Sequence, residues 1–445
     1  MTRSKRYEGK RVGIVGYGVE GRVSAQYWRR QGAHVTIFDG NDQLEVPTGM
    51  SAVVGDNYLD NFDGFDVLVH SPGIRPDRLV TSTHQHQIVT SATAEFFRHC
   101  PAPIIGVTGT KGKGTTSTLV TKLLEAAGYK VWLGGNIGQP ALEFIDDITA
   151  QDKVVLELSS FQLMDLPQSP QTAVCLMMVP EHLDWHTDIE EYIAAKGNIT
   201  RYQTAQDMVI YHGSNDWSRQ VAELSIGHKT TYMKQPGAYI DNDAVMMAGQ
   251  RICGTNDVGL VGAHMLENIC AAVTAVWDMV HHDACLIAKV IKDFKGLPMR
   301  LEPMERVDGV VYVNDSYSTN QYATMAALTS FEQAPIVILG GFDRGIDLTP
   351  MITAVAEYAP RGVVTIGQTA TIIRDGLHQR GHDLVVNGGS TMTEIVAAAA
   401  KMAQSGDVVI LSPGCASFDM FKNFKDRGEQ FRRAVAGLPG KHEAI

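Results

Sequence analysis

The chain has 445 residues, too many for one hydrophobic core, and typical domain sizes predict about three domains. Charged residues make up 20% and the formal net charge is −11, which is typical of a soluble globular protein and disfavours nonspecific binding of nucleic acid. The six cysteines lack paired spacing, so we expect reduced thiols in the cytoplasm rather than a zinc site or a disulfide framework. Residues 1–10 are basic and lead directly into a strand-like segment, so we expect neither a signal peptide nor a membrane span.

In chain order, the predicted elements alternate strands with helices, the pattern of α/β domains with parallel sheets. The first region has short β-branched runs at Val12–Val15, Val35–Phe38 and Val67–Val69. The second begins with a strand at Ile104, followed by a glycine-rich loop and a helix that we expect to end at Gly128.

A third region repeats the alternation. Its predicted strands and helix are Val310–Val313, Ile336–Leu339, Val363–Ile366, Val408–Leu411 and the helix Met392–Met402. We place the hinge before it at Gly296–Pro298, and expect domains at residues 1–91, 92–298 and 299–445.

The first glycine motif, Gly16–Gly21, follows a strand and opens a helix. In that context backbone amides and a helix N-terminus can approach a diphosphate. Asp39 ends the next strand, where an acid commonly meets a ribose hydroxyl. The motif alone is compatible with a nicotinamide or flavin site, a nucleotide-diphosphate sugar site, or a structural turn.

The second glycine motif lies between the strand at Ile104 and the next helix, and it ends in a Gly-Lys pair. Its backbone amides can surround phosphate oxygens while Lys113 neutralises the β and γ charges. Lys111 and Lys113 would repel each other and the helix dipole unless an anion were bound, which makes a plain surface turn the weaker interpretation.

Three further residues are candidates for chemistry. Glu157 ends an apolar strand, where parallel sheets place ligands, and is a plausible Mg²⁺ ligand. His182 follows the apolar run Ala173–Val179 at what we expect to be a strand exit. Lys196 lies in a predicted helix, and by residue type alone it is a solvated surface lysine.

The chain resembles the Mur ligase family in a series of motifs that occur in order over nearly its whole length. The motifs are Gly109–Thr115, Gly134–Gly138, Glu157–Gln162, Glu181–Asp184, Ala194–Lys196, Gly296–Arg300, Asn314–Ser316, Gly340–Gly341, Leu411–Asp419 and Phe421–Phe424. Chance agreement of so many ordered motifs is negligible.

The resemblance implies an α/β fold of three domains: a Rossmann-like UDP-binding domain, a P-loop ATPase-like domain with a parallel sheet, and a Rossmann-like C-terminal domain that closes on ATP and the amino acid. It implies a cytoplasmic enzyme of peptidoglycan precursor synthesis, and hence of cell-wall biogenesis, cell shape and division. The expected reaction adds D-glutamate to UDP-N-acetylmuramoyl-L-alanine through an acyl phosphate, with ATP and two Mg²⁺ ions. We expect a monomer that binds these small substrates and neither nucleic acid nor membrane.

The resemblance also assigns site residues. Those expected to bind ATP are Thr110, Lys111, Gly112, Lys113, Gly114, Thr115, Thr116, Asn268, Arg300 and Asp315. Those expected to bind the UDP-sugar are Val19, Glu20, Asp39, Ser71, Pro72, Gly73 and Asn136, and those expected to bind the amino acid are Thr319, Arg344, Ser417 and Phe424. The expected catalytic residues are Lys113, Glu157, His182 and Lys196, and the metal ligands Thr115, Glu157, His182 and Lys196. Carbamylation of Lys196, which turns a cation into an anion, would explain a lysine near metals.

Three residues depart from the family pattern. Gly114 follows the loop lysine where Ser or Thr is usual, so Thr115 is expected to supply the hydroxyl. Tyr317 stands where a lysine is common, and Glu20 replaces a small hydroxyl residue. These departures keep open a related ligase that uses another amino acid, such as L-glutamate, or a folate-like acceptor. A non-catalytic nucleotide-binding subunit and a nicotinamide-dependent oxidoreductase are two further hypotheses for the sequence.

Overall fold

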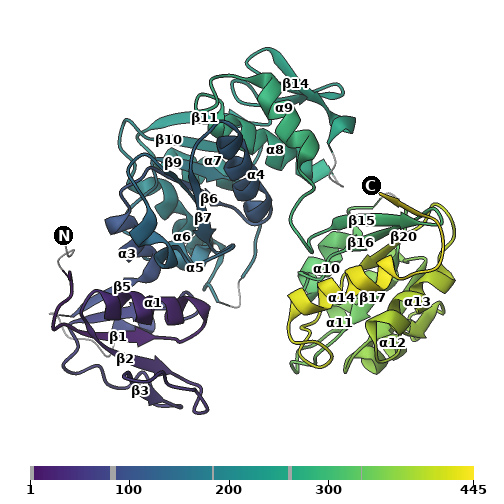
Figure 1. Ribbon diagram of the computed structural model, residues 1–445, viewed down its shortest axis with the longest axis horizontal. Coiled ribbons are helices and arrows are strands. Elements are labelled where there is room, and N and C mark those ends of the chain that lie inside the picture. Colours follow the sequence, from purple (N-terminus) through teal and green to yellow (C-terminus); the bar gives the residue numbers. More distant parts are fainter. Residues whose placement is uncertain (1–4, 81–86, 183–184, 259–262, 332, 445) are drawn as a thin grey trace. The chain divides into compact units, whose positions relative to one another are not determined.

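The computed structural model describes residues 5–80, 87–182, 185–258, 263–331 and 333–444. The chain forms two compact units (Figure 1). The first unit comprises Met1–Asp257 and Leu266–Ile291, and the second comprises Val258–Met265 and Lys292–Ile445.

The first unit begins with a parallel five-stranded sheet in the order β3-β2-β1-β4-β5. Its strands are β1 (Arg11–Val15), β2 (His34–Asp39), β3 (Ser51–Val54), β4 (Val67–His70) and β5 (Ile88–Ser91), and its helices are α1 (Val19–Arg30), α2 (Pro76–Val80) and α3 (Ala92–His99). The adjacent inner strands β1 and β4 are almost wholly buried, as expected for β-branched runs covered on both faces.

A second parallel sheet in the same unit has the order β11-β10-β9-β6-β8-β7. Its strands are β6 (Ile104–Thr108), β7 (Val131–Gly135), β8 (Lys153–Glu157), β9 (Thr172–Cys175), β10 (Met208–His212) and β11 (His228–Tyr232). The helices and short 3-10 turns around it are α4 (Lys113–Ala126), η1 (Ala141–Glu143), η2 (Ile145–Asp147), α5 (Ser160–Leu163), α6 (Ile189–Arg201) and α7 (Asp216–Glu223). An antiparallel ribbon and two helices complete the unit: β12 (Tyr239–Asp241), β13 (Ala244–Met247), β14 (Gln250–Gly254), η3 (Thr255–Asp257), α8 (Ala263–Val276) and α9 (Ala284–Asp293).

The two parallel sheets of the first unit share one hydrophobic core. Trp28 of α1, Phe96 of α3 and Phe144 beside η1 belong to the same buried cluster. The Phe96 and Phe144 rings meet edge to face, with centroids 5.8 Å apart. Residues from the two sheets are therefore held at fixed positions across this seam.

The second unit is a seven-stranded sheet in the order β19-β18-β17-β20-β16-β15-β21. Its strands are β15 (Glu302–Val307), β16 (Val310–Asn314), β17 (Ile336–Gly340), β18 (Gly362–Ile366), β19 (Val385–Asn387), β20 (Val408–Leu411) and β21 (His442–Ala444), and its helices are α10 (Gln321–Leu328), α11 (Thr349–Tyr358), α12 (Ala370–His378), α13 (Met392–Met402) and α14 (Phe424–Ala436). Helices α10, α11 and α12 belong to one buried cluster, and α13 and α14 to another, so helices cover both faces. Near one edge of this sheet, β15 pairs antiparallel with both β16 and β21.

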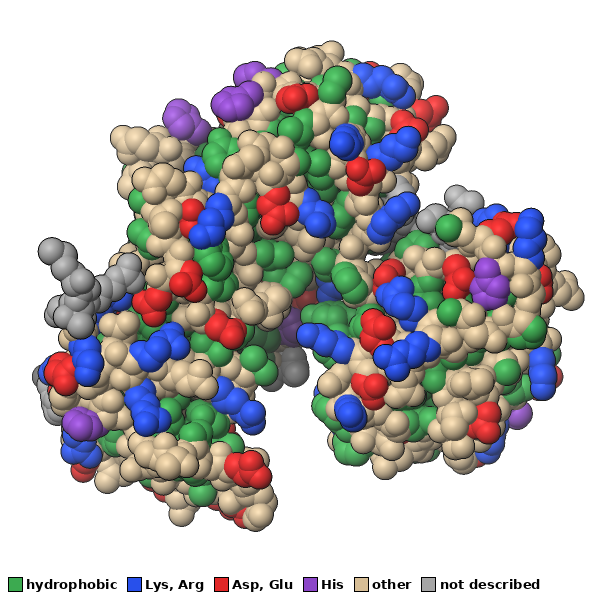
Figure 2. All heavy atoms as spheres, viewed as in Figure 1, with side chains coloured by type: hydrophobic (Ala, Val, Ile, Leu, Met, Phe, Trp, Pro, Cys, Tyr) green, Lys and Arg blue, Asp and Glu red, His purple; other side chains and the backbone are tan. Residues whose placement is uncertain are grey.

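The predicted α/β fold class with parallel sheets is confirmed, and the expected strands and the helix Met392–Met402 are all present. One expectation is wrong: the apolar run after Ala173 is a strand only as far as Cys175. The domain boundaries at residues 91 and 298 stay predictions. Among the described residues, no helix is long and apolar enough to cross a membrane. Figure 2 shows charged side chains of both signs interspersed on the visible face.

Candidate active site

The phosphate loop joins β6 to α4 and turns at Gly112. Gly112 is the N-cap of α4 and has a left-handed backbone, with φ of +83°. A Cβ atom at this position would overlap Asn268 Oδ1, so only glycine fits. Lys113 Nζ donates to the carbonyl oxygens of Gly109 at 3.0 Å and Thr110 at 2.9 Å. An ammonium group therefore lies beside a helix N-terminus, a combination that binds phosphate oxygens.

Most of the other predicted nucleotide residues of the first unit surround this loop. Asn268, on α8, accepts a hydrogen bond from Thr116 Oγ1 at 3.4 Å, which brings a distant segment to the first turn of α4. Gly114, Thr115 and Thr116 are buried in that turn, whereas Lys111 is exposed on the loop.

Thr110 uses its side chain to fix the loop. Its hydroxyl donates to Val179 O at 3.0 Å, accepts from Val179 N at 2.9 Å, and lies 2.8 Å from Tyr192 Oη. The hydroxyl thus ties the loop to the segment that precedes His182.

Lys196, on α6, is buried, with only 2% of its surface exposed. Its Nζ donates to Gly109 O at 2.9 Å and Thr108 Oγ1 at 3.3 Å, and lies 4.7 Å from the centre of the Tyr192 ring. Burial, followed by the charge of Lys113, lowers the pKa of Lys196 well below its ordinary value. The interpretation of Lys196 as a solvated surface lysine is wrong, because its helix face packs inward against the phosphate loop.

Glu157 lies where the sequence predicts it, at the carboxyl end of β8. Strands β6 and β8 pair with Val107 opposite Glu157, so the carboxylate is next to the start of the phosphate loop. Asn136 Nδ2 donates to Glu157 Oε1 at 2.8 Å, and Asn136 N donates to Glu157 O at 2.9 Å. A residue expected to bind the UDP-sugar therefore also orients an expected metal ligand.

His182 occupies a left-handed backbone conformation, with φ of +58°, outside any helix or strand. Its ring contacts Phe161 at a centroid distance of 4.9 Å, and Nε2 lies 3.6 Å from Glu181 Oε2. The side chain is 44% exposed. Leu183 and Asp184 of the same motif lie outside the described residues.

The chemistry of these donors fits Mg²⁺ bound together with phosphates. Within the described residues no three side chains of His, Cys, Asp or Glu converge as a metal cage. Mg²⁺ usually binds one or two protein carboxylates and completes its shell with water and substrate phosphates. Glu157 beside the phosphate loop meets that requirement, while the roles of Thr115, His182 and Lys196 as ligands stay predictions.

The first glycine motif folds as a tight turn between β1 and α1. A Cβ atom on Gly21 would overlap the carbonyl oxygen of Gly16, so the helix can approach the turn only with glycine there. Ser71 Oγ donates to the same carbonyl oxygen at 2.7 Å. The turn and the loop after β4 are thereby held together, as the expected set Ser71, Pro72 and Gly73 requires.

Asp39 also serves this turn. Its carboxylate accepts hydrogen bonds from the backbone amides of Tyr17 at 2.6 Å and Asn41 at 2.9 Å. Val19 projects into solvent, with 75% of its surface exposed. The ribose contact predicted for Asp39 stays a prediction.

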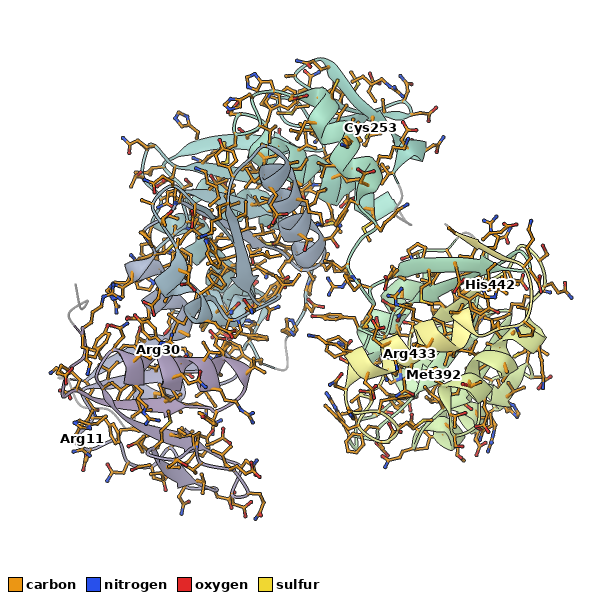
Figure 3. All side chains as sticks on the ribbon, viewed as in Figure 1. Arg11, Arg30, Cys253, Met392, Arg433 and His442 are labelled. Atoms are coloured by element: carbon orange, nitrogen blue, oxygen red, sulfur yellow. The ribbon has the colours of Figure 1, made fainter. Side chains whose placement is uncertain are left out.

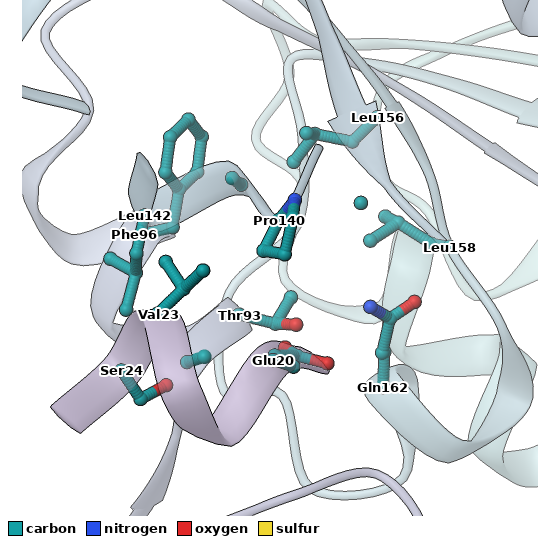
Figure 4. Close-up of a pocket in the computed structure, with 13 residues that line it drawn as sticks. Glu20, Val23, Ser24, Thr93, Phe96, Pro140, Leu142, Leu156, Leu158 and Gln162 are labelled. Carbon is teal, nitrogen blue, oxygen red and sulfur yellow. The ribbon is translucent and has the colours of Figure 1, made fainter. Parts of the chain in front are cut away.

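Glu20 faces a small pocket at the seam between the two parallel sheets (Figure 4). Burial raises the pKa of Glu20 to about 7, and the charge of His70 and hydrogen bonds from Gln162 and Thr93 limit the rise. The nearby His70 is itself paired with Asp165, with Nε2 2.8 Å from Oδ2. The pocket is lined by Glu20, Val23, Ser24, Ala92, Thr93, Phe96, Gly135, Pro140, Ala141, Leu142, Leu156, Leu158 and Gln162.

In the second unit, Asp315 is buried and already holds the loop around it. Its Oδ2 accepts from Ser318 Oγ at 2.6 Å and Ser412 Oγ at 2.7 Å, and its Oδ1 accepts from Leu301 N at 3.1 Å. Burial raises the pKa of Asp315 to about 6. Its predicted contact with ATP is not tested by this geometry.

Arg300 lies between two residues with left-handed backbones, Met299 at φ +62° and Leu301 at φ +43°. Its guanidinium lies over the Tyr317 ring, 4.5 Å from the centroid. The Phe424 ring meets the Tyr317 ring edge to face at 5.3 Å. The departure at Tyr317 therefore creates a stack of three side chains.

Arg427 is a functional candidate that the sequence analysis missed. It is fully buried on α14, and its guanidinium donates to Ser316 Oγ and Ser316 O at 3.0 Å, Cys415 O at 3.1 Å and Ala416 O at 3.4 Å. It thus joins the loop that leads to Thr319 with the loop that carries Ser417. An arginine in an otherwise polar, amphipathic helix gives no sequence signal for this role.

The other residues expected to bind the amino-acid substrate lie in the same unit. Phe342 N donates to Ala416 O at 2.9 Å, which brings the loop of Arg344 to the loop of Ser417. Arg344 is exposed, Ser417 is buried and Thr319 is partly buried.

Comparison with known proteins shows what the chain is similar to. The family model described as the Mur ligase middle domain matches residues 107–276, and the model described as the Mur ligase glutamate ligase domain matches residues 299–415. UDP-N-acetylmuramoylalanine--D-glutamate ligase of Acetivibrio thermocellus is 38% identical over 98% of both chains, and the same-named protein of Clostridium novyi is 36% identical over 96% of this chain and 97% of that one.

Solved structures show the same fold at low identity. MurC from Thermotoga maritima has a TM-score of 0.57 at 17% identity, covering 96% of this chain and 99% of that chain. MurF from Acinetobacter baumannii has a TM-score of 0.59 at 14% identity, covering 97% and 93%. The predicted three-domain architecture and the predicted family are both confirmed, and the chain belongs to the Mur ligase family of ATP-dependent ligases.

Proposed function

We propose that this chain joins D-glutamate to UDP-N-acetylmuramoyl-L-alanine in the cytoplasm, using ATP and an acyl-phosphate intermediate. The observation that carries the proposal is the convergence of two lysines on the phosphate loop. Lys113 and Lys196 both donate to Gly109 O, beside the strand end that bears Glu157. Two cations this close repel each other unless anions join them, which supports a site for phosphate and a modified lysine.

Nucleotide binding follows from the loop. The backbone amides of residues 109–116 and the Lys113 ammonium hold the β- and γ-phosphates, and Asn268 holds the first turn of α4 in place. Arg300 and Asp315 of the second unit act on the same nucleotide. When bound, two Mg²⁺ ions would supply charge neutralisation at the phosphate oxygens, held by Thr115, Glu157, His182 and modified Lys196.

Lys196 is suited to carbamylation. Burial and the charge of Lys113 lower its pKa, which raises the fraction of neutral amine, and only a neutral amine can add to CO₂. The nitrogen–carbon bond forms as the amine loses a proton, and the product is a carbamate anion near Lys113. The modification exchanges a repulsive pair of charges for an attractive one.

In the reaction, the acceptor carboxylate attacks the γ-phosphorus of ATP, and ADP leaves. The amine of the incoming amino acid then attacks the acyl carbonyl, and phosphate leaves from the tetrahedral intermediate. Glu20, Asp39, Asn136 and the Ser71–Gly73 loop bind the UDP-sugar in this proposal. Positioning and electrostatic stabilisation supply most of the rate.

The second unit selects the amino acid through Thr319, Arg344, Ser417 and Phe424. Arg427 keeps two of their loops together, which supports a single preformed site. Tyr317 removes a cation that many relatives would place here, and this is the observation that favours a second candidate: a ligase of the same chemistry that takes another amino acid.

Phosphate release tests the proposal. Purified protein is given ATP, Mg²⁺ and UDP-N-acetylmuramoyl-L-alanine, with D-glutamate, L-glutamate or other amino acids in parallel. We expect release only with D-glutamate, lost in Lys113→Ala and kept in Lys122→Ala, whose side chain lies exposed on the same helix. Release with a different amino acid supports the second candidate, and no release with any amino acid contradicts the proposed reaction.

A further inference from the structure

Arg75 connects the two parallel sheets of the first unit. It follows the Ser71–Gly73 loop, and its Nη1 donates to Trp185 O at 2.7 Å. Its two terminal nitrogens also grip Glu191, with Nη1 3.0 Å from Oε2 and Nη2 2.9 Å from Oε1. The guanidinium lies over the Trp185 ring, 5.1 Å from the centroid, and only 19% of the side chain is exposed. This is the paired geometry that makes arginine contacts specific.

The residue whose carbonyl Arg75 binds is itself hydrogen-bonded to His182. The backbone amides of Trp185 and His186 donate to His182 O at 3.1 and 2.9 Å. Phe161 packs against all three rings, at centroid distances of 4.9 Å to His182, 4.7 Å to Trp185 and 5.7 Å to His186. A displacement of Trp185 is therefore passed directly to His182.

Glu191 also holds the residues that follow Trp185. Its Oε2 accepts from Thr187 N at 2.8 Å and lies 3.3 Å from His186 Nδ1. Hydrogen bonding to Arg75 lowers the pKa of Glu191 to about 2, and Asp77 is the second acid on the same guanidinium, at 2.9 Å. The Arg75–Glu191 pair thus stays charged over the pH range in which a ligase works.

His182 needs such support. A non-glycine residue with φ of +58° is sparsely populated unless its surroundings hold it there. Arg75 donates one hydrogen bond to Trp185 O, three residues after the histidine, and two to Glu191 on α6. The contact that restrains the histidine therefore comes from a residue two positions after the Ser71–Gly73 loop.

We propose that Arg75 is a positioning residue that couples the acceptor-binding loop, Ser71–Gly73, to the placement of His182. The coupling rests on the proposed function, in which the Ser71–Gly73 loop binds the UDP-sugar. Arg75 itself touches neither the nucleotide nor the reacting atoms. Binding of the acceptor moves or stiffens the loop, and Arg75 passes this to the histidine through Trp185.

The kinetic test compares Arg75→Met with Arg30→Met. Arg30, on α1 and labelled in Figure 3, is a matched control. It also pairs with an acid, Asp146 of η2 at 3.7 Å, but both of these side chains are exposed. We expect Arg75→Met to lower kcat about 10- to 100-fold, as a small misplacement of a reactive group does, with the acceptor KM changed less than about threefold. Arg75→Lys keeps the charge but loses the paired geometry, so we expect an intermediate kcat. The kcat and acceptor KM of Arg30→Met should match those of the wild-type protein.

A binding measurement separates this coupling from ligation. The emission of Trp185, obtained by difference against Trp185→Phe, is followed as UDP-N-acetylmuramoyl-L-alanine is added without ATP, while calorimetry measures acceptor affinity. We expect an emission change in the unmodified protein that is absent in Arg75→Met although the acceptor still binds. An unchanged kcat, or an emission change that survives in Arg75→Met, overturns the proposal.

The two proposals fail in different ways. Loss of acceptor binding in folded Arg75→Met would make Arg75 a direct ligand and would also overturn the positioning role. If the unmodified protein binds the acceptor but releases no phosphate, the proposed function is wrong, and the emission measurement still decides whether Arg75 carries the coupling.

Discussion

Replacing Tyr317 by the lysine common in the family should impair this protein rather than improve it. The Tyr317 ring supports the Arg300 guanidinium at 4.5 Å and is braced by Phe424 at 5.3 Å. A lysine would remove the ring and place a second cation beside the first. Because we expect Arg300 to hold ATP, the cost should appear in the KM for ATP.

The structure sets the size of this effect. Tyr317 is 44% exposed, so the lost cation–π contact is worth about 0.5–1 kcal/mol, the range for exposed sites. Two like charges about 5 Å apart in a water-like medium repel by about 0.8 kcal/mol. Together these give about 1.3–1.8 kcal/mol, which corresponds to an increase of about 10- to 20-fold in the KM for ATP.

Steady-state kinetics measures this with two controls. Tyr317→Phe keeps the ring and should change the KM for ATP less than about twofold. Tyr202→Leu removes a ring of similar exposure, 48%, in the first unit and should have no effect. An unchanged or lower KM for ATP in Tyr317→Lys would refute the assignment of Arg300 to the nucleotide and of Tyr317 to its support.

Three further predictions concern Glu20, Arg427 and Gly112. Glu20 has a pKa raised from 4.5 to about 7, so the folded state binds more protons than the unfolded state between these pH values. The free energy of unfolding should therefore fall by up to about 3 kcal/mol as pH rises through that window. Urea titrations at pH 5 and pH 8 should show a smaller fall in Glu20→Gln, and equal falls in the two proteins would contradict the burial argument. Arg427→Met leaves the carbonyl groups of the two loops unpaired but also removes a buried charge, so we expect urea titration to show a net loss of about 2–4 kcal/mol in the free energy of unfolding. The control Arg433→Met, at an exposed position of the same helix, should lose less than about 0.5 kcal/mol. Equal losses would contradict the role of Arg427 in holding the two loops together. Gly112→Ala should abolish ADP binding, measured by calorimetry, because the new Cβ overlaps Asn268. The control Gly128→Ala, with a similar φ of +91° but open space around the Cβ, should lose about 1 kcal/mol of stability and bind ADP normally. Intact ADP binding in Gly112→Ala would show that the loop adapts to the added Cβ.

Local signals in the sequence were enough to predict the two glycine loops and their helices. A buried strand, glycines at fixed spacing and a helix start are all local, and Gly16 and Gly112 have the left-handed backbones that such turns require. The burial of Lys196 also had a local signal that the interpretation by residue type ignored. It lies four residues after Tyr192 and three before Ile199, so helical periodicity puts all three on the buried face.

Contacts between distant segments could not be predicted in this way. Arg75 lies 110 residues from Trp185 and 116 from Glu191, and Arg427 lies 111 residues from Ser316. Such pairs depend on how sheets pack, and the local sequence around an isolated arginine does not tell whether its side chain is solvated or buried. The strand expected to lead to His182 ended early for a related reason: beyond Cys175 the backbone binds the phosphate loop, as in the hydrogen bonds from Thr110 N to Met177 O and from Leu176 N to Thr108 O.

Ligation of D-glutamate to UDP-N-acetylmuramoyl-L-alanine is tested most directly by identifying the amino acid that disappears. The protein is incubated with the acceptor, ATP, Mg²⁺ and racemic glutamate, and the residual enantiomers are separated by chiral chromatography while ADP and the new amide are quantified. We predict that only D-glutamate is consumed, with one ADP formed for each amide. Consumption of L-glutamate, or ADP formed without an amide, would contradict the proposed reaction.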